Sequence, residues 1–225
     1  MSPPTVLPDR NGALTQRPGR NAAGANDLAA AIARELRRRA SAAPLSDAGG
    51  GLRVVELGSG DPPGHCAGAV LVPGTTPVPA RGAVAAAVDD DASCGMVTRH
   101  AGAEARRLAV PLRVVHVWTG TGASAAGGRL LRHDRMCDAD HLLAAVLYEN
   151  LPEAEAGIAE REILHDPEPA RALAALSATL SLLVVAARAV ATGRGAVLGG
   201  TARGLVGRTA CPLVVVPATA ESATW

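Results

Sequence analysis

Aromatic residues are almost missing from this chain of 225 residues, which has two Trp, one Tyr and no Phe. Proteins that bind single-stranded nucleic acids stack bases on aromatic side chains, so this scarcity argues against that class. The net charge of +1 provides no basic surface for duplex DNA. Because 48% of the residues are hydrophobic, we expect a core of Ala, Val and Leu between closely packed helices and sheet.

Long apolar segments and closely spaced cysteines are lacking too. Prolines and arginines occupy the N-terminus where a signal peptide needs an apolar segment, and the apolar run near residue 185 is too short to span a bilayer. The cysteines are far apart, which is typical of reduced thiols: Cys66, Cys94, Cys137 and Cys211. We therefore expect a cytoplasmic protein that does not enter the membrane.

The most informative stretch lies near the C-terminus. An aliphatic run over residues 182–187 leads to Gly199-Gly200-Thr201, where a short helix is expected, and a second aliphatic run, Leu213–Val216, ends at Pro217. Short runs of β-branched residues and Leu between turn residues indicate strands buried on both faces of a parallel sheet. A glycine loop between such a strand and a helix is a common place for phosphate to bind.

Similar patterns precede this stretch. Further strands are expected over residues 83–88, 112–118 and 158–164, and helices over 94–108, 138–149 and 167–177. Ser93 is expected to cap the first of these helices, with Val97, Ala101, Ala105 and Leu108 facing inward. The alternation of strands and helices predicts a doubly wound α/β fold with a five-stranded parallel sheet.

The N-terminal third has a different character. Residues 1–25 are predicted to be disordered, and Asn26 or Asp27 is expected to cap a helix that ends near residue 40. On that helix Leu28, Ile32 and Leu36 share one face, and the three arginines at 37–39 are interpreted as a solvated face.

Two short strands are expected next, over residues 52–57 and from Ala69 to Val72. The sequence AVLVPGT at 69–75 is similar to LVVVPAT at 213–219. We interpret residues 26–79 as the truncated relic of a first domain of a tandem pair. The alternative is a chance match between two Val-rich strands.

Residues 80–220 resemble the universal stress protein family. The family's loop, G-x2-G-x9-G-[S/T], is matched in spacing by Ala186, Ala189, Gly199 and Gly200, and Cys211-Pro212 precedes the last strand as in the family. The sequence Val88-Asp89-Asp90-Asp91 resembles the family's Val-Asp-Gly-Ser, and the strand at 112–118 is similar too. The resemblance implies a universal-stress-type domain with the adenine nucleotide alpha hydrolase-like fold.

The resemblance also implies a nucleotide site formed by Asp89, Ala186, Ala189, Gly199, Gly200 and Thr201. Alanine replaces glycine at two loop positions, so methyl groups stand where phosphate would lie. Gly200 lacks the family's hydroxyl, for which Thr201 is a substitute, and Asp90 and Asp91 add negative charge. We therefore expect a stress-response protein that acts by binding, without catalysis and with impaired or absent ATP binding. The alternative is an ATP-binding stress sensor that uses Asp89 and the Gly199 loop.

Family resemblance further implies self-association through the last strand. Leu213–Val216 is expected to pair either with a second chain or, within one chain, with the strand from Ala69 to Val72, which would cover the edge of the sheet. An unidentified protein partner is also expected.

A metal site is a weaker alternative. His133, Cys137 and His141 follow one another at steps of four residues, a spacing at which two neighbours can share a zinc ion. The outer two would lie about 12 Å apart on a helix, too far to share it. We expect no metal, and no Ser-His-Asp or paired-carboxylate arrangement is recognisable.

Overall fold

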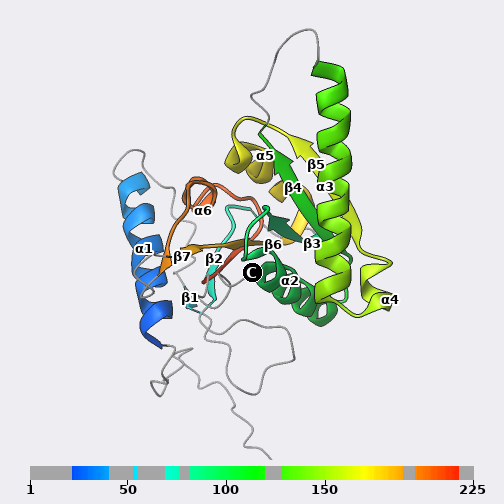
Figure 1. Cartoon of the computed structure of the whole chain (residues 1–225). Coiled ribbons are helices and arrows are strands. Elements are labelled where there is room, and N and C mark those ends of the chain that lie inside the picture. Colours follow the sequence, from blue (N-terminus) through cyan, green and yellow to red (C-terminus); the bar gives the residue numbers. More distant parts are fainter. Residues whose placement is uncertain are drawn as a thin grey trace, which may run out of the picture.

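The computed structural model describes residues 22–40, 53–54, 69–76, 82–119, 128–189 and 196–217. Side chains are described for residues 28–38, 69–76, 82–119, 136–188 and 197–217. Figure 1 shows a sheet covered by helices on both faces. The expectation for residues 1–21 lies outside the described residues.

The centre of the described fold is a set of five parallel strands in the order β9-β6-β3-β4-β5. Their bounds are β3 (Ala83–Val88), β4 (Leu112–Trp118), β5 (Glu160–His165), β6 (Leu180–Ala186) and β9 (Leu213–Val216). The predicted α/β fold with a doubly wound parallel sheet is therefore confirmed. Three strands, β3, β4 and β9, begin and end where the aliphatic runs predicted.

Helices on the two faces form two separate cores with the sheet. Helices α2 (Cys94–Leu108), α3 (Gly128–Asn150) and α4 (Glu153–Ala156) pack on the face that includes Val84, Ala86 and Val114. Helices α1 (Ala22–Ala40), α5 (Pro169–Leu176) and α6 (Gly200–Leu205) pack on the face that includes Ala85 and Val115. A 3₁₀ turn, η1 (Ser177–Thr179), joins α5 to β6. Side chains that alternate along each strand thus fill both cores.

Several predicted details are wrong. Ser93 occupies the N-cap position of α2 as predicted, but its hydroxyl donates to Asp91 Oδ1 over 2.5 Å and makes no capping hydrogen bond. Leu108, predicted to face inward, is 36% exposed. The third helix begins at Gly128, well before the predicted residue 138, since its first turns lack an apolar stripe. Strand β5 begins at Glu160, and Ile158 before it is 83% exposed. Helix α1 begins at Ala22, so positions 26 and 27 lie inside it.

Two short N-terminal strands enlarge the predicted five-stranded sheet to seven. Strand β2 (Val70–Val72) pairs antiparallel with β9, and β1 (Arg53–Val54) pairs antiparallel with β2. The rest of the strand predicted at 52–57 lies outside the described residues. The outer edge of β9 is thus paired within the chain. That residues 26–79 are a relic of a first domain stays a prediction.

Helix α1 and the turn after β2 hold this N-terminal part on the domain. Leu28 and Ile32 are fully buried, and Leu36 packs partly buried against the same core, as predicted. After β2, the backbone N–H of Thr75 donates to the carbonyl oxygen of Thr209 over 2.9 Å, and that of Thr76 to Ala210 over 3.1 Å. Apolar burial and backbone hydrogen bonds therefore both attach this segment.

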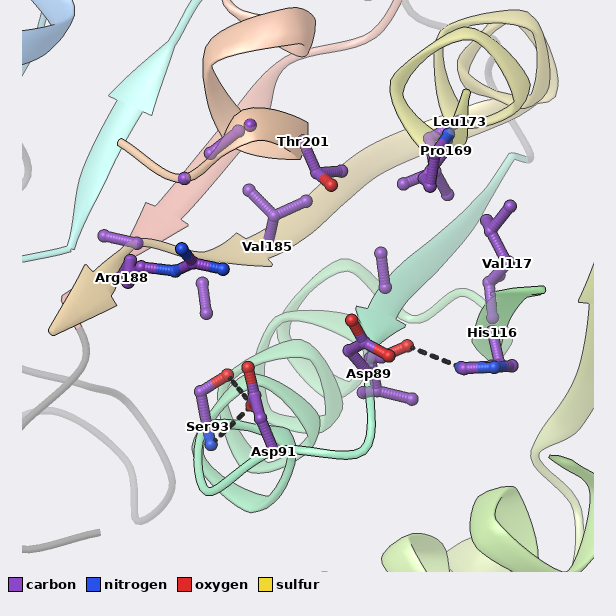
Figure 2. Close-up of a pocket in the computed structure, with 18 of the residues that line it drawn as sticks. Asp89, Asp91, Ser93, His116, Val117, Pro169, Leu173, Val185, Arg188 and Thr201 are labelled. Carbon is purple, nitrogen blue, oxygen red and sulfur yellow. Dashed lines mark hydrogen bonds between the residues drawn. The ribbon is translucent and has the colours of Figure 1, made fainter. Parts of the chain in front are cut away.

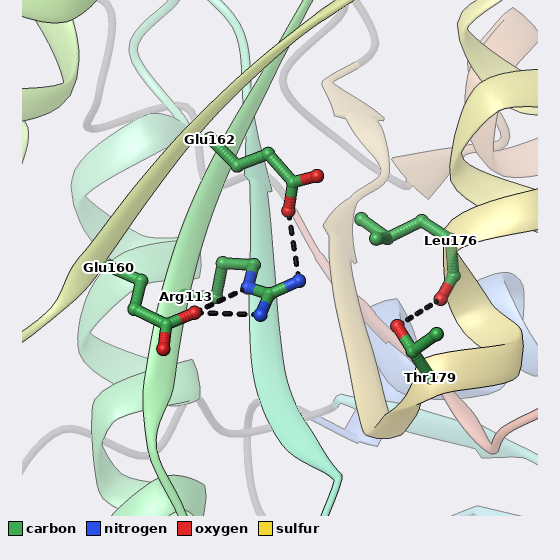
Figure 3. Close-up of polar contacts among 5 residues, drawn as sticks. All are labelled: Arg113, Glu160, Glu162, Leu176 and Thr179. Carbon is green, nitrogen blue, oxygen red and sulfur yellow. Dashed lines mark hydrogen bonds and ion pairs between the residues drawn. The ribbon is translucent and has the colours of Figure 1, made fainter.

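The opposite edge of the sheet is strand β5, which is charged and pairs on its outer side with no other described strand. Arg113 of β4 donates through Nε to Glu160 over 2.8 Å and through Nη1 to Glu162 over 3.0 Å (Figure 3). Arg161 of β5 forms an ion pair with Asp140 of α3 at 2.8 Å. Charged side chains on an edge strand discourage pairing with other chains.

None of the helices in the described ranges is long and apolar enough to cross a membrane. The cytoplasmic location stays a prediction.

Candidate functional site

A cleft of about 460 Å³ opens where β3, β4 and β6 end at their carboxyl termini. Its floor and walls come from these strand ends, from α5 and from the segment that begins α6. Figure 2 shows Asp89 and His116 on the β3–β4 side and Arg188 and Thr201 on the β6 side. Ligands of open α/β sheets bind in this position because adjacent crossovers leave a crevice there.

The β3 side of the cleft is acidic. Asp89 follows β3 directly and is exposed, and its Oδ1 accepts a hydrogen bond from the backbone N–H of Asp90 over 3.0 Å. Asp91 Oδ1 accepts from the backbone N–H of Ser93 over 2.8 Å. Asp89 and Asp91 line the cleft, and this turn therefore carries two carboxylates toward any ligand.

Two aromatic residues of β4 form the adjoining wall. His116 Nδ1 lies 3.2 Å from the carbonyl oxygen of Val88, so a proton on Nδ1 makes a hydrogen bond and leaves Nε2 as the acceptor nitrogen. The Trp118 ring lies 4.4 Å from the His165 ring, centroid to centroid, at 49°. The sequence analysis did not include His116 in the site, although its place near the end of a correctly predicted strand was the available signal.

Four of the predicted loop residues line the cleft, and the side chain of the fifth lies outside the described residues. Ala186 ends β6 and lines the cleft, as do Gly199, Gly200 and Thr201 around the start of α6. Ala189 belongs to the short strand β7 (Arg188–Ala189), which pairs with β8 (Ala196–Val197), and its side chain lies outside the described residues. Residues 190–195, with the glycines at 193 and 195, lie outside the described residues.

Gly199 and Gly200 leave open space that no packing requirement explains. A Cβ on Gly200 would meet no atom within 4 Å, and one on Gly199 would come no closer than 3.8 Å, to the Cβ of Arg188. Gly199 has φ −62°, which any residue can adopt. Glycine at these positions therefore widens the cleft without serving the described fold itself.

Arg188 is a lining residue that the sequence interpretation missed. It follows β6 at the mouth of the cleft and is exposed. Within the described part of the chain, no hydrogen bond or ion pair involves its guanidinium. Its position between the two loop alanines was the signal, because a side chain next to a phosphate loop is placed to contact the ligand.

The structure describes the side chains of only two of the three residues in the zinc alternative. Cys137 and His141 are exposed on α3, whereas the side chain of residue 133 lies outside the described residues. Among the side chains that are described, no group of three metal-ligating residues occurs. The absence of a metal stays a prediction.

Comparison with known proteins identifies the family. A sequence model of the universal stress protein family matches residues 81–217, close to the domain predicted from the loop spacing. No curated protein matches the chain.

Solved structures with a similar fold include a universal stress protein from Archaeoglobus fulgidus (23% identity, 59% of this chain, 96% of that chain, TM-score 0.44). A structure of the Archaeoglobus fulgidus protein in complex with dAMP has 22% identity, 61% and 98% coverage and TM-score 0.43. Universal stress protein UspA from Lactobacillus plantarum has 18% identity, 60% and 98% coverage and TM-score 0.49. Because the sequence match covers more than half of the chain, the chain belongs to the universal stress protein family.

Proposed function

We propose that this stress-response protein acts by binding and does not turn over a substrate. The supporting observation is that polar groups of the cleft already contact other groups of the protein. The Ser93 hydroxyl donates to Asp91, and His116 Nδ1 contacts a backbone carbonyl. Within the described lining, no hydroxyl or thiol is hydrogen-bonded to a histidine as a nucleophile would be.

We further propose that the cleft binds ATP weakly or not at all. The charges carry this argument, because Asp89 and Asp91 oppose Arg188 across the described lining, and two carboxylates against one guanidinium repel a triphosphate. The methyl group of Ala186 also occupies space at the end of β6 where a glycine would admit phosphate. The repulsion from the acidic turn and the missing glycine both lower the affinity for ATP.

The second candidate is a nucleotide-responsive sensor. Its support is the cleft volume of about 460 Å³, within the ordinary range of small-molecule sites, and the open space at Gly199 and Gly200. Arg188 would then contact phosphate, and Asp89 the sugar end of the ligand. In this reading the alanines lower the affinity without abolishing it.

Calorimetric titration of ATP with Mg²⁺ into the full-length protein separates the two candidates. We expect no binding to the native chain and recovered binding to the Ala186→Gly/Ala189→Gly double variant. Ala92→Gly is the matched control, because Ala92 lines the cleft from the acidic turn, away from the loop. Micromolar binding by the native chain would instead establish the sensor. No ATP binding by either protein would direct attention to Asp89 and Asp91 and to a protein partner.

We also propose that the pairing of β2 with β9 replaces self-association through the last strand. The edge that would pair with a second chain is already hydrogen-bonded, and a protein partner would have to use another surface.

A further inference from the structure

A second cavity, of about 460 Å³, lies between α1, β8 and α6, on a different side of the Gly199 segment from the cleft. Figure 1 shows α1 beside β7 and α6, and α1 packs directly against β8. Three arginines line it: Arg34 and Arg38 from α1 and Arg203 from α6. Glu35 is the acidic residue of the described lining.

The charges of this cavity do not cancel. Arg38 holds the Glu35 carboxylate by a fork of two hydrogen bonds, Nε to Oε2 over 3.0 Å and Nη2 to Oε1 over 2.6 Å. Arg203 Nη2 donates to the carbonyl oxygen of Leu198 over 3.2 Å, which positions its guanidinium at the cavity. Since one carboxylate faces three guanidiniums, the described lining keeps an excess of positive charge.

Arg34 contributes the clearest unused donors. Its side chain is exposed, and the described part of the chain contains no hydrogen bond or ion pair to it. A guanidinium offers five N–H donors in a planar fork that matches phosphate oxygens. Among the described residues, nothing therefore occupies the donors of Arg34, which can bind an anion in the cavity.

The rest of the lining is apolar. Ala31 of α1 and Val197 of β8 face the cavity together with Leu198, and Val197 is 44% exposed. An exposed Val beside a cluster of arginines suits a ligand with a charged group and a small apolar body.

We propose that this cavity is an anion site for a small organic phosphate monoester, with the phosphate at Arg34 and Arg203 and the apolar body against Ala31 and Val197. The site is separate from the cleft and is built partly from α1, which lies outside the family-matched residues. The two cavities share one wall. Gly199, Gly200 and Thr201 line the cleft, whereas Val197, Leu198 and Arg203 line the arginine cavity.

The test is calorimetric titration of phenyl phosphate and of inorganic phosphate into the full-length protein. Phenyl phosphate should bind more tightly than inorganic phosphate, because only it contacts the apolar lining. Arg34→Gln should weaken phenyl phosphate roughly ten-fold or more, since a charge-assisted hydrogen bond is lost. Arg34→Lys keeps the charge but loses the planar fork of donors, so its affinity for phenyl phosphate should lie between those of the native protein and Arg34→Gln. Arg208→Gln, an exposed arginine outside the lining, should leave binding unchanged.

Two further measurements keep the outcome decisive. Thermal melting should show that Arg34→Gln folds like the native chain, because Arg34 makes no hydrogen bond or ion pair within the described structure. Arg188→Gln removes the cationic residue of the cleft and should leave phenyl phosphate binding intact. Failure of native protein to bind phenyl phosphate at millimolar concentration would overturn the proposal. So would equal binding by native protein and Arg34→Gln, or loss of binding in Arg188→Gln, which would place the anion in the cleft.

Discussion

Val70 of β2 lies directly opposite Val215 of β9 in antiparallel register, and Leu71 lies opposite Val214. Val70 corresponds to Val214 in the repeated sequence and Leu71 to Val215, so the second pair is the first with the two strands exchanged. Residues 69–75 and 213–219 are similar in sequence, so this register is the one that two equivalent strands adopt around a two-fold axis. Strand β2 thus occupies the position that a second copy of β9 would take, which supports the proposed tandem origin.

Removal of residues 1–79 should turn a monomer into a dimer. The deletion removes β2 and exposes both the hydrogen-bonding edge of β9 and the core that Leu28 and Ile32 cover. Light scattering coupled to size-exclusion chromatography measures the mass. A chain lacking residues 1–21 keeps α1, β1 and β2 and should stay a monomer. An unchanged mass after the longer deletion would contradict the proposed role of β2.

A milder variant tests the same attachment without deletion. A Cβ at position 74 would lie 2.2 Å from the carbonyl oxygen of Ala210, which is backbone and cannot rotate away. Gly74→Ala should therefore loosen the backbone hydrogen bonds from Thr75 and Thr76 to residues 209–210. Amide hydrogen exchange should become faster at Thr75 and Thr76 and stay unchanged in β4. Equal protection in both proteins would show that the turn accommodates the methyl group.

Gly204 should be required for the contact between α5 and α6. A Cβ on Gly204 would lie 2.4 Å from the Cβ of Ala170, so Gly204→Ala forces the two helices apart. We expect a loss of about 1–3 kcal/mol in the free energy of unfolding, the usual cost of overpacking, measured by urea denaturation. Gly200→Ala is the matched control in the same helix, where a Cβ meets no atom within 4 Å. Equal effects of the two variants would refute the packing argument.

Cys211 should be unreactive at neutral pH. Burial raises the pKa of its thiol to about 11, although backbone N–H groups at Cys211 and Leu183 partly oppose the shift. Iodoacetamide labelling followed by peptide mapping should modify the exposed Cys137 and leave Cys211 unmodified. Labelling of Cys211 in the folded protein at a rate similar to Cys137 would contradict this.

The same thiol should make stability depend on alkaline pH. The unfolded thiol ionises near pH 8.5 and the folded one only near 11, so raising the pH across this window favours the unfolded state. The stabilising contribution of the buried, protonated thiol is fully present below the unfolded pKa and is lost as the pH approaches 11. Cys211→Ala should flatten this part of the stability profile, whereas Cys137→Ala should leave it unchanged. Parallel profiles for the native chain and Cys211→Ala would show that other groups dominate.

Arg113 should contribute little to stability despite its two glutamate partners. Its side chain is 26% exposed and lies with Glu160 and Glu162 at the sheet edge, where solvent screens the charges. We expect Arg113→Gln to cost about 1 kcal/mol or less in urea denaturation, and less still in 1 M salt. Arg208→Gln serves as the control for loss of a single exposed charge. A loss of several kcal/mol would mean that the two glutamates are strongly destabilising without Arg113.

Much of the domain was determined by its local sequence. The runs over 83–88, 112–118 and 213–216 predicted the strands to the residue. The first and last are apolar because both faces of these strands are buried, whereas β4 is only partly buried and admits Arg113 and His116. The order of strands and helices then required a doubly wound sheet. The spacing around Gly199 located part of the loop, and Asp89, Ala186, Gly199, Gly200 and Thr201 do line one cleft.

Only the tertiary structure decided which distant residues meet. Strand β2 could have remained apart from the domain, and its pairing with β9 depends on contacts between segments far apart in the chain. Arg188 and His116 are marked in the sequence only by their places beside the loop alanines and near a strand end, and they face one cleft because β6 and β4 end there. The arginine cavity likewise exists because α1 packs on β8. Local patterns report the burial of each segment, whereas register and neighbours follow from how the whole chain minimises its exposed apolar surface.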